Sequence, residues 1–456
     1  MAVGEVFVMA CLPPWYYRCA IRLATPLYRL MVHQKSAKLP HYLDEVNARF
    51  GKAFAPTPAA PVIWCHAVSL GELNTAYPLL KILINQGFHL WITSTTQTGF
   101  ARARTLFADE LANGAVQHSF VPIDKTDVVE RFIKHIQPTA VLFIETELWA
   151  TTLFELAQRH IPTVMVNARL TDKSYQGYAK FGKLSRSMMA NLSLIIAQDT
   201  ASADRFVSLG ADKAKVKCAD SLKWTSPASL TNSQRAELAK LKSQSDNRPI
   251  WLAASTHDGE ELSVLMVHER LLETMPNARL IIVPRHPERF EMVANLCRER
   301  GFDVLRRSLG QQLDDVPQGA NDKKTVYLAD SMGELMLWYA VCDVCLVGGS
   351  LVDKGGHTPI EPASVGTPII MGQYTKNADV LVADLRAVGA LVQVFDEQAF
   401  FDALHHWLSD KVAASHAGQA GQRLVHQKAN AAQVQADFVQ QVLPSCFNSQ
   451  DNCELS

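Results

Sequence analysis

Short apolar runs alternate with longer helical patterns from residue 62 to residue 395, and this alternation constrains the fold more than any other feature. Most of the runs are continuously apolar, which is typical of parallel strands covered by helices on both faces. They form two series. The first consists of VIWCHAVS, HLWITST, VQHSFVP, AVLFIET, TVMVNA, LIIAQD and VKCAD, and the second of IWLAAST, RLIIVPR, DVLRR, TVYLAD, VCLVGGS, PIIMG and LVQVF.

A polar, turn-rich stretch separates the two series. The chain of 456 residues is also too long for one ordinary hydrophobic core. We therefore predict an α/β protein with two doubly wound, Rossmann-like domains that face each other across a cleft. The predicted domains are residues 41–224 and 250–425, joined by a linker at 225–249 and followed by a C-terminal helix and tail at 426–456.

The first 40 residues are aromatic and apolar, yet prolines and arginines interrupt them. A secretory signal places its basic residues before the apolar core, and a membrane span needs roughly 20 uninterrupted apolar residues, so neither fits. A helix at the level of the lipid headgroups, with cations facing anionic lipid, is one interpretation. A helix packed on its own domain is the other. The residues concerned are Pro13, Pro14, Pro26, Arg18, Arg22, Arg29, Trp15, Tyr16, Tyr17 and Tyr28.

Charge and cysteine spacing argue against nucleic acid and zinc as ligands. The formal net charge of −1 provides no general attraction for nucleic acid, so an anionic ligand has to be met by local cations or helix ends. The only close cysteine pair, Cys342 and Cys345, lies in an apolar run, and no second pair has zinc-site spacing. We expect reduced, buried thiols and no metal site.

Charged side chains follow several of the predicted strands. Ligands of doubly wound sheets bind beyond the carboxyl ends of the strands, so these residues define a candidate ligand site. The first series is followed by Glu72, Glu145 and Arg169, and the second by Arg285 and His286. Polar turns without a ligand are the alternative.

The stretch GGSLVDKGGHTPIEPASVGTPIIMG at residues 348–372 contains six glycines and follows an apolar run. Its first Gly-Gly pair is expected to let backbone amides approach an anion, and a helix that begins at Pro359 would add free amides. Glu361 in the first turn would bind both hydroxyls of a ribose, unless it only complements the helix dipole. Phosphate plus ribose indicates a nucleotide.

The chain contains neither a GxxxxGK[ST] loop nor a GxGxxG fingerprint, so ATP hydrolysis and dinucleotide redox chemistry are not supported. A nucleotide on the second of two facing α/β domains is typical of the GT-B type of glycosyltransferase. In that type the first domain binds the acceptor and supplies the base, and Glu72 in WCHAVSLGE is the best candidate. The alternative is a carboxylate in a helix turn with no chemistry.

Ordered motifs over nearly the whole chain resemble the 3-deoxy-D-manno-octulosonic acid (Kdo) transferase family, which adds Kdo to the lipid A precursor of Gram-negative bacteria. Ala150 and Thr151 replace the usual Pro-Asn, Thr358 and Ile360 replace Asn and Leu, and Trp224 replaces Phe. None of these changes removes an acid, a base or a glycine. The motifs are HAVSLGE, ETELW, NARL, GYAKFGK, SLKW, STHDGEE, VPRHPERF, SMGELMLWY and CLVGGSLVDKGGHTPIEPA.

The resemblance implies roles for residues of both domains. It implies that Glu72 is the general base and that Glu145 and Lys223 stabilise the transition state. Lys223 and Arg285 are the expected cations for the phosphate or the sugar carboxylate, so we expect no metal and no cofactor. The implied cytidine monophosphate (CMP) contacts are Pro284, Arg285, Met332, Gly333, Glu334, Thr358, Pro359, Ile360 and Glu361, and further candidate phosphate or sugar contacts are Gly348, Gly349, Ser350, His286 and Arg169.

The implied reaction is an inverting transfer of Kdo from CMP-Kdo to the lipid A precursor, lipid IVA. The implied enzyme is anchored through its N-terminus on the cytoplasmic side of the inner membrane, whose lipid surface is its third partner. A nucleotide-sugar epimerase of the same fold is the enzymatic alternative. A two-lobed solute-binding protein is the other alternative, and it would carry a secretory signal. The oligomeric state, the number of Kdo units added and full crossing of the bilayer stay open.

Overall fold

The computed structural model describes most of the chain. Parts of the predicted membrane segment and of the predicted tail, residues 1–9 and 444–456, lie outside the described residues. The described residues are 10–57, 60–225, 229–244, 248–315 and 324–443.

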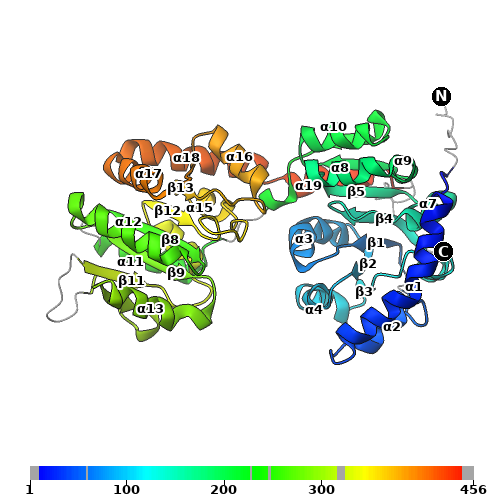
Figure 1. Ribbon diagram of the computed structural model, residues 1–456, viewed down its shortest axis with the longest axis horizontal. Coiled ribbons are helices and arrows are strands. Elements are labelled where there is room, and N and C mark those ends of the chain that lie inside the picture. The colour runs from blue at the N-terminus through cyan, green and yellow to red at the C-terminus, as the bar shows by residue number, and fades with distance from the viewer. Residues whose placement is uncertain (1–9, 58–59, 226–228, 245–247, 316–323, 444–456) are drawn as a thin grey trace, which may run out of the picture. The chain divides into compact units, whose positions relative to one another are not determined.

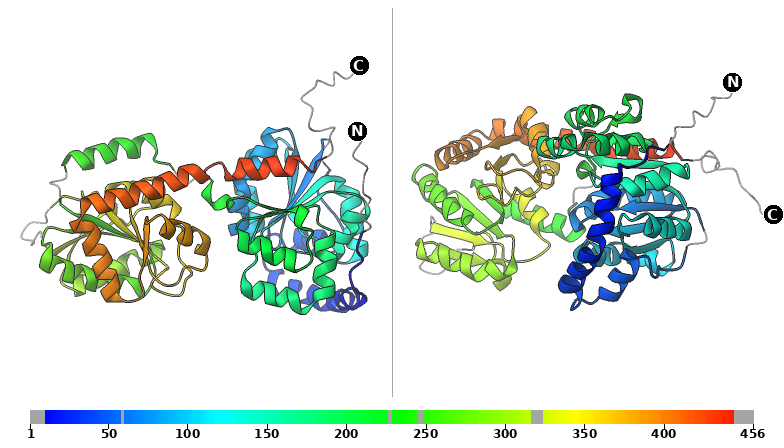
Figure 2. Two further views of the ribbon diagram at one scale, coloured as in Figure 1. Left: turned by 90° about the horizontal axis from the view of Figure 1, so that it is seen from above. Right: turned by 45° about the vertical axis from the view of Figure 1, so that its right-hand side comes forward.

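The chain forms two compact units (Figures 1 and 2). One comprises the described residues of 1–225 and 430–456, and the other those of 226–429. Each unit contains one seven-stranded sheet in which all described strand pairs are parallel. The prediction of two doubly wound α/β domains is confirmed.

The sheet of the first unit has the order β3-β2-β1-β4-β5-β6-β7. The order runs outward in both directions from β1 and β4, so the topological switch point lies between these two strands. Trp64 of β1 pairs with Trp91 of β2 on one side and with Val141 of β4 on the other. The strands are β1 (Val62–His66), β2 (His89–Ser94), β3 (Val116–Phe120), β4 (Pro138–Ile144), β5 (Thr163–Ala168), β6 (Leu194–Ala197) and β7 (Val216–Cys218).

The N-terminal helix α1 (Trp15–Ser36) packs on the first unit with one side. The Tyr17 hydroxyl donates a 2.7 Å hydrogen bond to the buried carboxylate of Asp124. The Tyr28 ring lies 6.4 Å from the ring of Phe50. Tyr17 and Tyr28 therefore face the protein, contrary to the expectation that the aromatic residues of this helix lie among lipid headgroups.

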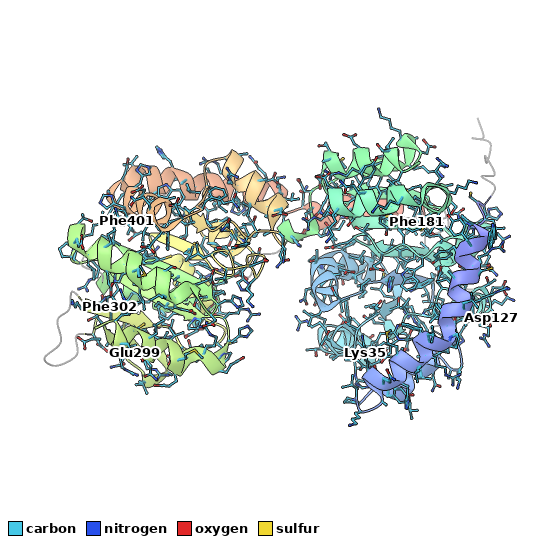
Figure 3. The ribbon with its side chains drawn as sticks, in the orientation of Figure 1. Lys35, Asp127, Phe181, Glu299, Phe302 and Phe401 are labelled. Atoms are coloured by element: carbon cyan, nitrogen blue, oxygen red, sulfur yellow. The ribbon has the colours of Figure 1, made fainter. Side chains whose placement is uncertain are left out.

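The other side of α1 is exposed and apolar. Trp15, Leu23 and Leu27 are 72%, 76% and 70% exposed. Lys35, labelled in Figure 3, lies in the last turn, where a cation complements the helix dipole. Among the described residues, no helix combines the length and the apolar content needed to cross a membrane.

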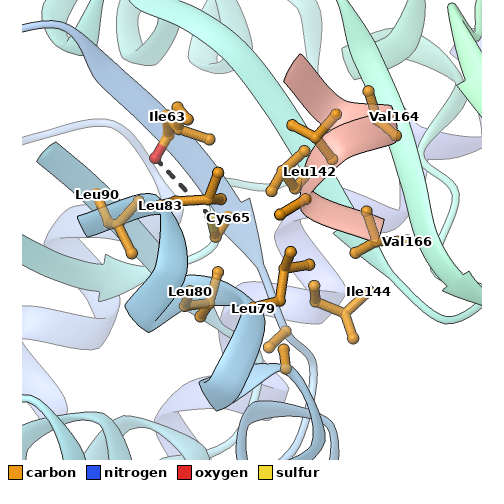
Figure 4. Packing of buried hydrophobic residues seen from close by; sticks show 14 of the residues in the cluster. Ile63, Cys65, Leu79, Leu80, Leu83, Leu90, Leu142, Ile144, Val164 and Val166 are labelled. Atoms are coloured by element: carbon orange, nitrogen blue, oxygen red, sulfur yellow. Dashed lines mark hydrogen bonds between the residues drawn. The ribbon is translucent and has the colours of Figure 1, made fainter. Parts of the chain in front are cut away.

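Side chains of β1 alternate between two cores. Ile63 and Cys65 join a core with α3, α4 and α19 (Figure 4), whereas Val62 and Trp64 join a core with α6, α7 and α9. Burying one such aliphatic side chain contributes about 1.5–3 kcal/mol to folding. The helices of this unit beyond α1 are α2 (Tyr42–Arg49), α3 (Leu70–Asn85), α4 (Gln97–Leu106), α5 (Ala108–Ala112), α6 (Thr126–Ile136), α7 (Ala150–Gln158), α8 (Asp172–Lys180), α9 (Gly182–Ala190), α10 (Thr200–Ser208) and α19 (Ala431–Gln440).

The sheet of the second unit has the order β10-β11-β9-β8-β12-β13-β14, with its switch point between β8 and β12. Leu346 of β12 pairs with Ala253 of β8 across this point, and both are buried under α12, α13 and α17. The strands are β8 (Ile250–Thr256), β9 (Arg279–Pro284), β10 (Asp303–Arg306), β11 (Thr325–Leu328), β12 (Val344–Val347), β13 (Ile369–Met371) and β14 (Leu391–Gln393). The helices are α11 (Asn232–Gln244), α12 (Glu260–Thr274), α13 (Phe290–Glu299), α14 (Leu335–Val341), α15 (Ile360–Ser364), α16 (Asp379–Ala387), α17 (Glu397–Ser409) and α18 (Lys411–Lys428).

The pattern of predicted strands does not indicate which unit two of the helices join. Helix α11, within the predicted linker, belongs to the second unit, where Glu237 forms a 2.7 Å ion pair with Arg307. Helix α19 returns to the first unit. There Gln435 accepts a 2.9 Å bond from the Asn167 N–H and donates one of 2.9 Å to the Asp220 carbonyl.

Cys342 and Cys345 are buried in and beside β12, with 8% and 0% exposure. Both are free thiols, and burial raises the pKa of each well above its usual range. A thiol held in its protonated form is a poor nucleophile and a poor metal ligand. The predicted buried, reduced thiols are confirmed.

Candidate active site

The candidate site residues of each unit follow the carboxyl ends of its strands, and several of them lie beside the switch point. In the first unit Glu72 follows β1 and Glu145 follows β4. In the second unit His257 follows β8 and Gly348 follows β12. These are the positions at which doubly wound sheets bind ligands.

Glu72 lies in the first turn of α3, whose N-cap is Ser69, and the two residues form a variant of the capping box in which Glu72 binds the N–H before the N-cap. The Ser69 hydroxyl oxygen accepts a 3.4 Å hydrogen bond from the Glu72 N–H, and Glu72 Oε2 accepts one of 2.8 Å from the Val68 N–H. Burial is the main cause of a pKa raised to about 7, the Val68 N–H opposes this rise, and the carboxylates of Glu145 and Glu147 add to it. The side chain therefore caps the helix and also exchanges its proton near neutral pH.

Glu145 begins the turn after β4 with a left-handed backbone at φ 60°. Such a conformation costs a non-glycine residue about 1–3 kcal/mol and is concentrated at functional sites. The Thr146 hydroxyl donates to the Arg169 carbonyl, which ties this turn to the one after β5. Burial also raises the pKa of Glu147. Glu147 is not among the predicted site residues, although its position directly after the strand is a signal for it.

Lys223 lies on a short 3₁₀ turn that Asn167 holds at the end of β5. The side-chain oxygen of Asn167 accepts bonds of 3.0 Å from the Leu222 N–H and 3.1 Å from the Ser221 hydroxyl. Asn167 itself has φ 52°, a conformation that asparagine tolerates better than most residues. The structure thus brings Lys223 to the edge of the sheet that carries Glu145.

Helix α7 begins where the chain departs from the usual family sequence. One oxygen of the buried Asp124 carboxylate accepts a 2.8 Å bond from the Thr151 N–H. The other accepts bonds of 2.7 and 2.6 Å from the N–H and hydroxyl of Thr152. Because Asp124 satisfies these amides, the helix starts at Ala150 without a proline. The same carboxylate accepts the hydrogen bond from the Tyr17 hydroxyl, which links α1 to the start of α7.

The Gly-Gly turn after β12 uses its amides internally. The Gly348 N–H donates to a carbonyl of β8 at 2.8 Å. The N–H groups of Gly349, Ser350 and Leu351 donate to the buried carboxylate of Glu260 at 2.8, 3.1 and 2.9 Å. These amides are therefore not free to bind a phosphate, contrary to the expectation from the glycines.

Two glycines of residues 348–372 lie where a side chain would clash with the backbone of another segment. A Cβ on Gly348 would lie 2.5 Å from the Ser255 carbonyl oxygen, and a Cβ on Gly372 would overlap the Ser350 carbonyl. Gly349 has φ 67°, a conformation that disfavours a side chain. The glycines let backbone segments of the second unit approach one another.

Arg285 and His286 follow β9 and are exposed. Burial raises the pKa of Glu361, and the charge of Arg285 opposes this rise, so the two side chains interact electrostatically. Glu361 lies in the first turn of α15, whose N-cap is Pro359. The helix start expected at Thr358 and Pro359 is confirmed, but a helix of five residues adds only a small dipole to an anion site.

Met332, Gly333 and Glu334 form the turn between β11 and α14. The Met332 side chain is 64% exposed. The Arg307 guanidinium donates bonds of 3.0 and 2.6 Å to the two carboxylate oxygens of Glu334, and the Ser331 hydroxyl donates another. These bonds to Arg307 lower the pKa of Glu334, so its carboxylate stays charged and fixes the turn. Of the other predicted contacts, Pro284 ends β9 and Ile360 opens α15.

Comparison with known proteins identifies the family. Residues 44–226 match a family model described as 3-deoxy-D-manno-octulosonic-acid transferase (kdotransferase). The chain is 35% identical over 439 residues to the 3-deoxy-D-manno-octulosonic acid transferase of Haemophilus influenzae, covering 94% of this chain and 98% of that one. The chain belongs to the 3-deoxy-D-manno-octulosonic acid transferase family. It is similarly 31% identical over 395 residues to the Bordetella pertussis transferase of the same name, covering 85% and 89%.

As a Kdo transferase family member the chain is a glycosyltransferase. The solved structure of Acinetobacter baumannii MurG matches it with a TM-score of 0.52 and 13% identity, over 84% of this chain and 99% of that one. This likeness shows the fold, and the predicted GT-B type is confirmed. Nucleotide-sugar epimerases share the fold, but membership of the family favours the transferase.

Three carboxylates that organise the site are absent from the predicted residues. Asp124 and Glu260 are 1% and 0% exposed and bind backbone amides, and Glu147 adds charge beside Glu72. Glu260 belongs to the STHDGEE motif, and Asp124 follows β3. The motif is a sequence signal for Glu260 and the strand end is one for Asp124. Neither signal reveals which backbone amides the two carboxylates bind.

Proposed function

We propose that this chain transfers Kdo from CMP-Kdo to the lipid A precursor, lipid IVA, with inversion of configuration, in lipopolysaccharide core biosynthesis. The observation that carries the proposal is Glu72, a carboxylate with a pKa of about 7 at the carboxyl edge of the first sheet. An acceptor hydroxyl is a weak nucleophile, so transfer requires a base with such a pKa. Membership of the Kdo transferase family supports the choice of sugar.

In the proposed step, Glu72 accepts the proton of the acceptor hydroxyl while that oxygen bonds to the anomeric carbon of Kdo. The bond from this carbon to the phosphate oxygen breaks, and CMP leaves with the bonding electrons. Glu145 offsets positive charge on the sugar ring, and Lys223 stabilises the charge of the phosphate or of the sugar carboxylate. The proposed step uses neither a metal nor a cofactor.

The proposed nucleotide site lies on the second unit. Glu361 accepts hydrogen bonds from the ribose hydroxyls, and Arg285 with His286 binds the phosphate. The exposed side chain of Met332 packs against the base. The carboxylate of Glu334 holds the turn on which Met332 lies. The remaining proposed contacts are Pro284, Gly333, Thr358, Pro359 and Ile360.

The proposed acceptor is a lipid, so we further propose that α1 lies on the cytoplasmic surface of the inner membrane. Leu23, Leu27 and Leu30 are 76%, 70% and 54% exposed, and Arg22 and Arg29 on the same helix are exposed as well. An interfacial helix immerses such apolar side chains and places its arginines among lipid phosphates. This placement would keep the first unit at the surface that holds the acceptor.

The proposal is tested by incubating the protein with CMP-Kdo and lipid IVA and measuring the mass of the lipid product. We expect the lipid to gain the mass of one or more whole Kdo residues, with release of one CMP for each. An unchanged lipid together with epimerised free sugar would favour the epimerase. An unchanged lipid in a preparation that binds CMP would contradict the proposed acceptor.

A further inference from the structure

Two histidines meet at the switch point of the second sheet. His257 follows β8 and His357 lies beyond β12, and their Nε2 atoms are 2.9 Å apart. The rings are nearly parallel, with 8° between their planes and 5.1 Å between their centroids. A Cβ on Gly349 would lie 3.3 Å from the His357 ring and 3.4 Å from the His257 ring, so a glycine there leaves room for the pair. His286 meets His257 edge-on at 5.4 Å.

The contact between two imidazole nitrogens determines how the pair holds protons. One Nε2 donates and the other accepts, because two N–H groups or two lone pairs would repel at this distance. The accepting ring therefore carries its proton on Nδ1. A proton added to Nδ1 of the donating ring makes an imidazolium that donates to a neutral partner, which strengthens the contact. After this one protonation both Nδ1 atoms are N–H donors, and a second protonation would break the pair.

A shared metal ion does not account for the pair. Zinc binds imidazole nitrogens at about 2.0–2.1 Å, which separates two ligand atoms of a tetrahedral site by roughly 3.4 Å. The 2.9 Å separation of His257 and His357 is that of a direct hydrogen bond. The described residues contain no group of three or more histidine, cysteine or acidic side chains that could hold a metal.

The surroundings of His257 oppose a positive charge on the pair. Burial lowers the pKa of His257, and the charges of His286, Lys354 and Arg289 act in the same direction. Glu261 opposes them, but its carboxylate is bound by the Arg289 guanidinium at 2.5 and 3.1 Å. The net local charge therefore favours the neutral pair until an anion arrives.

The surroundings of His357 act in the same way. Burial lowers its pKa to about 4, and His257, Arg285 and His286 add to the effect. The buried carboxylate of Glu260 is already bonded to the N–H of His257 at 2.8 Å and to the amides of the Gly-Gly turn. An anion bound beside Arg285 would supply the negative charge that the pair lacks.

We infer that the His257–His357 pair is a further anion-binding element of the nucleotide site, and that it takes up one proton from solvent when a nucleotide phosphate binds. The proton adds to Nδ1 of the donating ring, and each Nδ1–H is then available to a phosphate oxygen. No covalent bond to the ligand forms or breaks. This inference rests on the nucleotide site proposed above.

Calorimetric titration of the full chain with CMP tests the inference. Titrations at pH about 8, where the free phosphate is doubly ionised, are run in two buffers with different ionisation enthalpies, and the difference in heat gives the protons taken up. We expect wild-type protein to take up nearly one proton for each CMP. His357→Gln and His257→Gln are expected to lose this uptake and to bind CMP about tenfold more weakly. His416→Gln, on the exposed surface of α18, is the matched control and should behave as wild type.

The outcomes separate the inference from the proposed function. CMP binding without proton uptake by the wild type, or equal uptake by both glutamine variants, overturns the inference and leaves the nucleotide site intact. A wild type that does not bind CMP contradicts the nucleotide site itself. If a variant does not fold, the pH dependence of CMP affinity in the wild type tests the inference instead. Proton uptake makes this affinity fall by up to about tenfold per pH unit above pH 7. An affinity independent of pH there would overturn the inference.

Discussion

Both sheets are doubly wound around a central switch point, although β11 lies between β9 and β10 in the second sheet, and their carboxyl edges carry different charged groups. At the carboxyl edge beside its switch point, the first unit presents Glu72, Glu145 and Glu147. The second unit presents cationic and titratable nitrogen groups, among them Arg285 and His286. One fold therefore supplies two chemically opposite sites, and the residues that follow the strands determine which.

Burial has the same effect on both edges, because it favours the neutral form of the key group. The pKa of Glu72 is raised to about 7, and that of His357 is lowered to about 4. A side chain whose uncharged form is favoured by burial changes its charge when a substrate binds beside it. The acidic edge, formed by Glu72, Glu145 and Glu147 of the first unit, suits removal of a proton. The basic edge, formed by Arg285 and the neighbouring histidines of the second unit, suits binding of an anion.

Breaking the acidic edge is expected to have the largest effect. Glu72→Gln keeps an oxygen that can accept the Val68 N–H, so α3 stays capped, but the amide cannot accept a proton. We expect turnover with CMP-Kdo and lipid IVA to fall by about 10²- to 10⁴-fold, with CMP affinity unchanged. Product formation and CMP titration on one preparation measure both. Turnover within about threefold of wild type would remove Glu72 as the base.

Each edge also depends on a buried carboxylate, Asp124 in the first unit and Glu260 in the second. Glu260→Ala leaves four backbone N–H groups without their acceptor. We expect the unfolding free energy of the second unit, measured with denaturant, to fall by on the order of 3 kcal/mol. Asp124→Ala should act comparably on the first unit. The control is Glu299→Ala, exposed at the end of α13 (Figure 3), and a loss for Glu260→Ala no larger than this control would contradict the assignment.

Weakening the basic edge should change binding rather than chemistry. Glu361→Ala removes the proposed ribose acceptor, and a hydrogen bond to a charged group contributes about 1.5–3 kcal/mol, so CMP affinity should fall about tenfold to hundredfold. Glu397→Ala is a matched control, because Glu397 is an exposed carboxylate in the first turn of α17. Equal CMP affinities for the two variants would leave Glu361 with only the role of complementing its helix dipole.

The smallest expected effect concerns the membrane surface. Leu27→Ser removes one exposed apolar side chain from α1, and an interfacial helix immerses each side chain only in part, so binding to anionic lipid vesicles should weaken about fivefold. Leu309→Ser changes a leucine that is 69% exposed on the second unit and should have no effect. Equal losses for both variants would mean that α1 is not the lipid-binding surface.

The sheets and the charge of each edge could be predicted from the sequence. All fourteen predicted strands are present, and the central ones are buried on both faces, which is why they read as continuous apolar runs. The acidic and basic edges follow directly, since Glu72, Glu145 and Arg285 stand just after such runs. Both features can be predicted because they depend on residues that are neighbours in the sequence.

Contacts between distant segments could not be predicted in the same way. The apolar face of α19 does not reveal which core it joins, and the structure places it in the first unit. Glu260 binds amides about ninety residues away, which removes the Gly-Gly amides from the anion site. The pairing of His257 with His357 depends on the closeness of two strands at a switch point, and no spacing in the sequence indicates it.

The pH dependence of transfer tests most directly the claim that the acidic edge removes the proton. Because the pKa of Glu72 is raised to about 7, the carboxylate needed as a base is lost as the pH falls below that value. We predict that kcat/KM for lipid IVA at saturating CMP-Kdo rises about tenfold per pH unit below 7, levels off above it, and loses this rise in Glu72→Gln. A flat profile between about pH 5.5 and 8.5, or the same rise in Glu72→Gln, would contradict the claim.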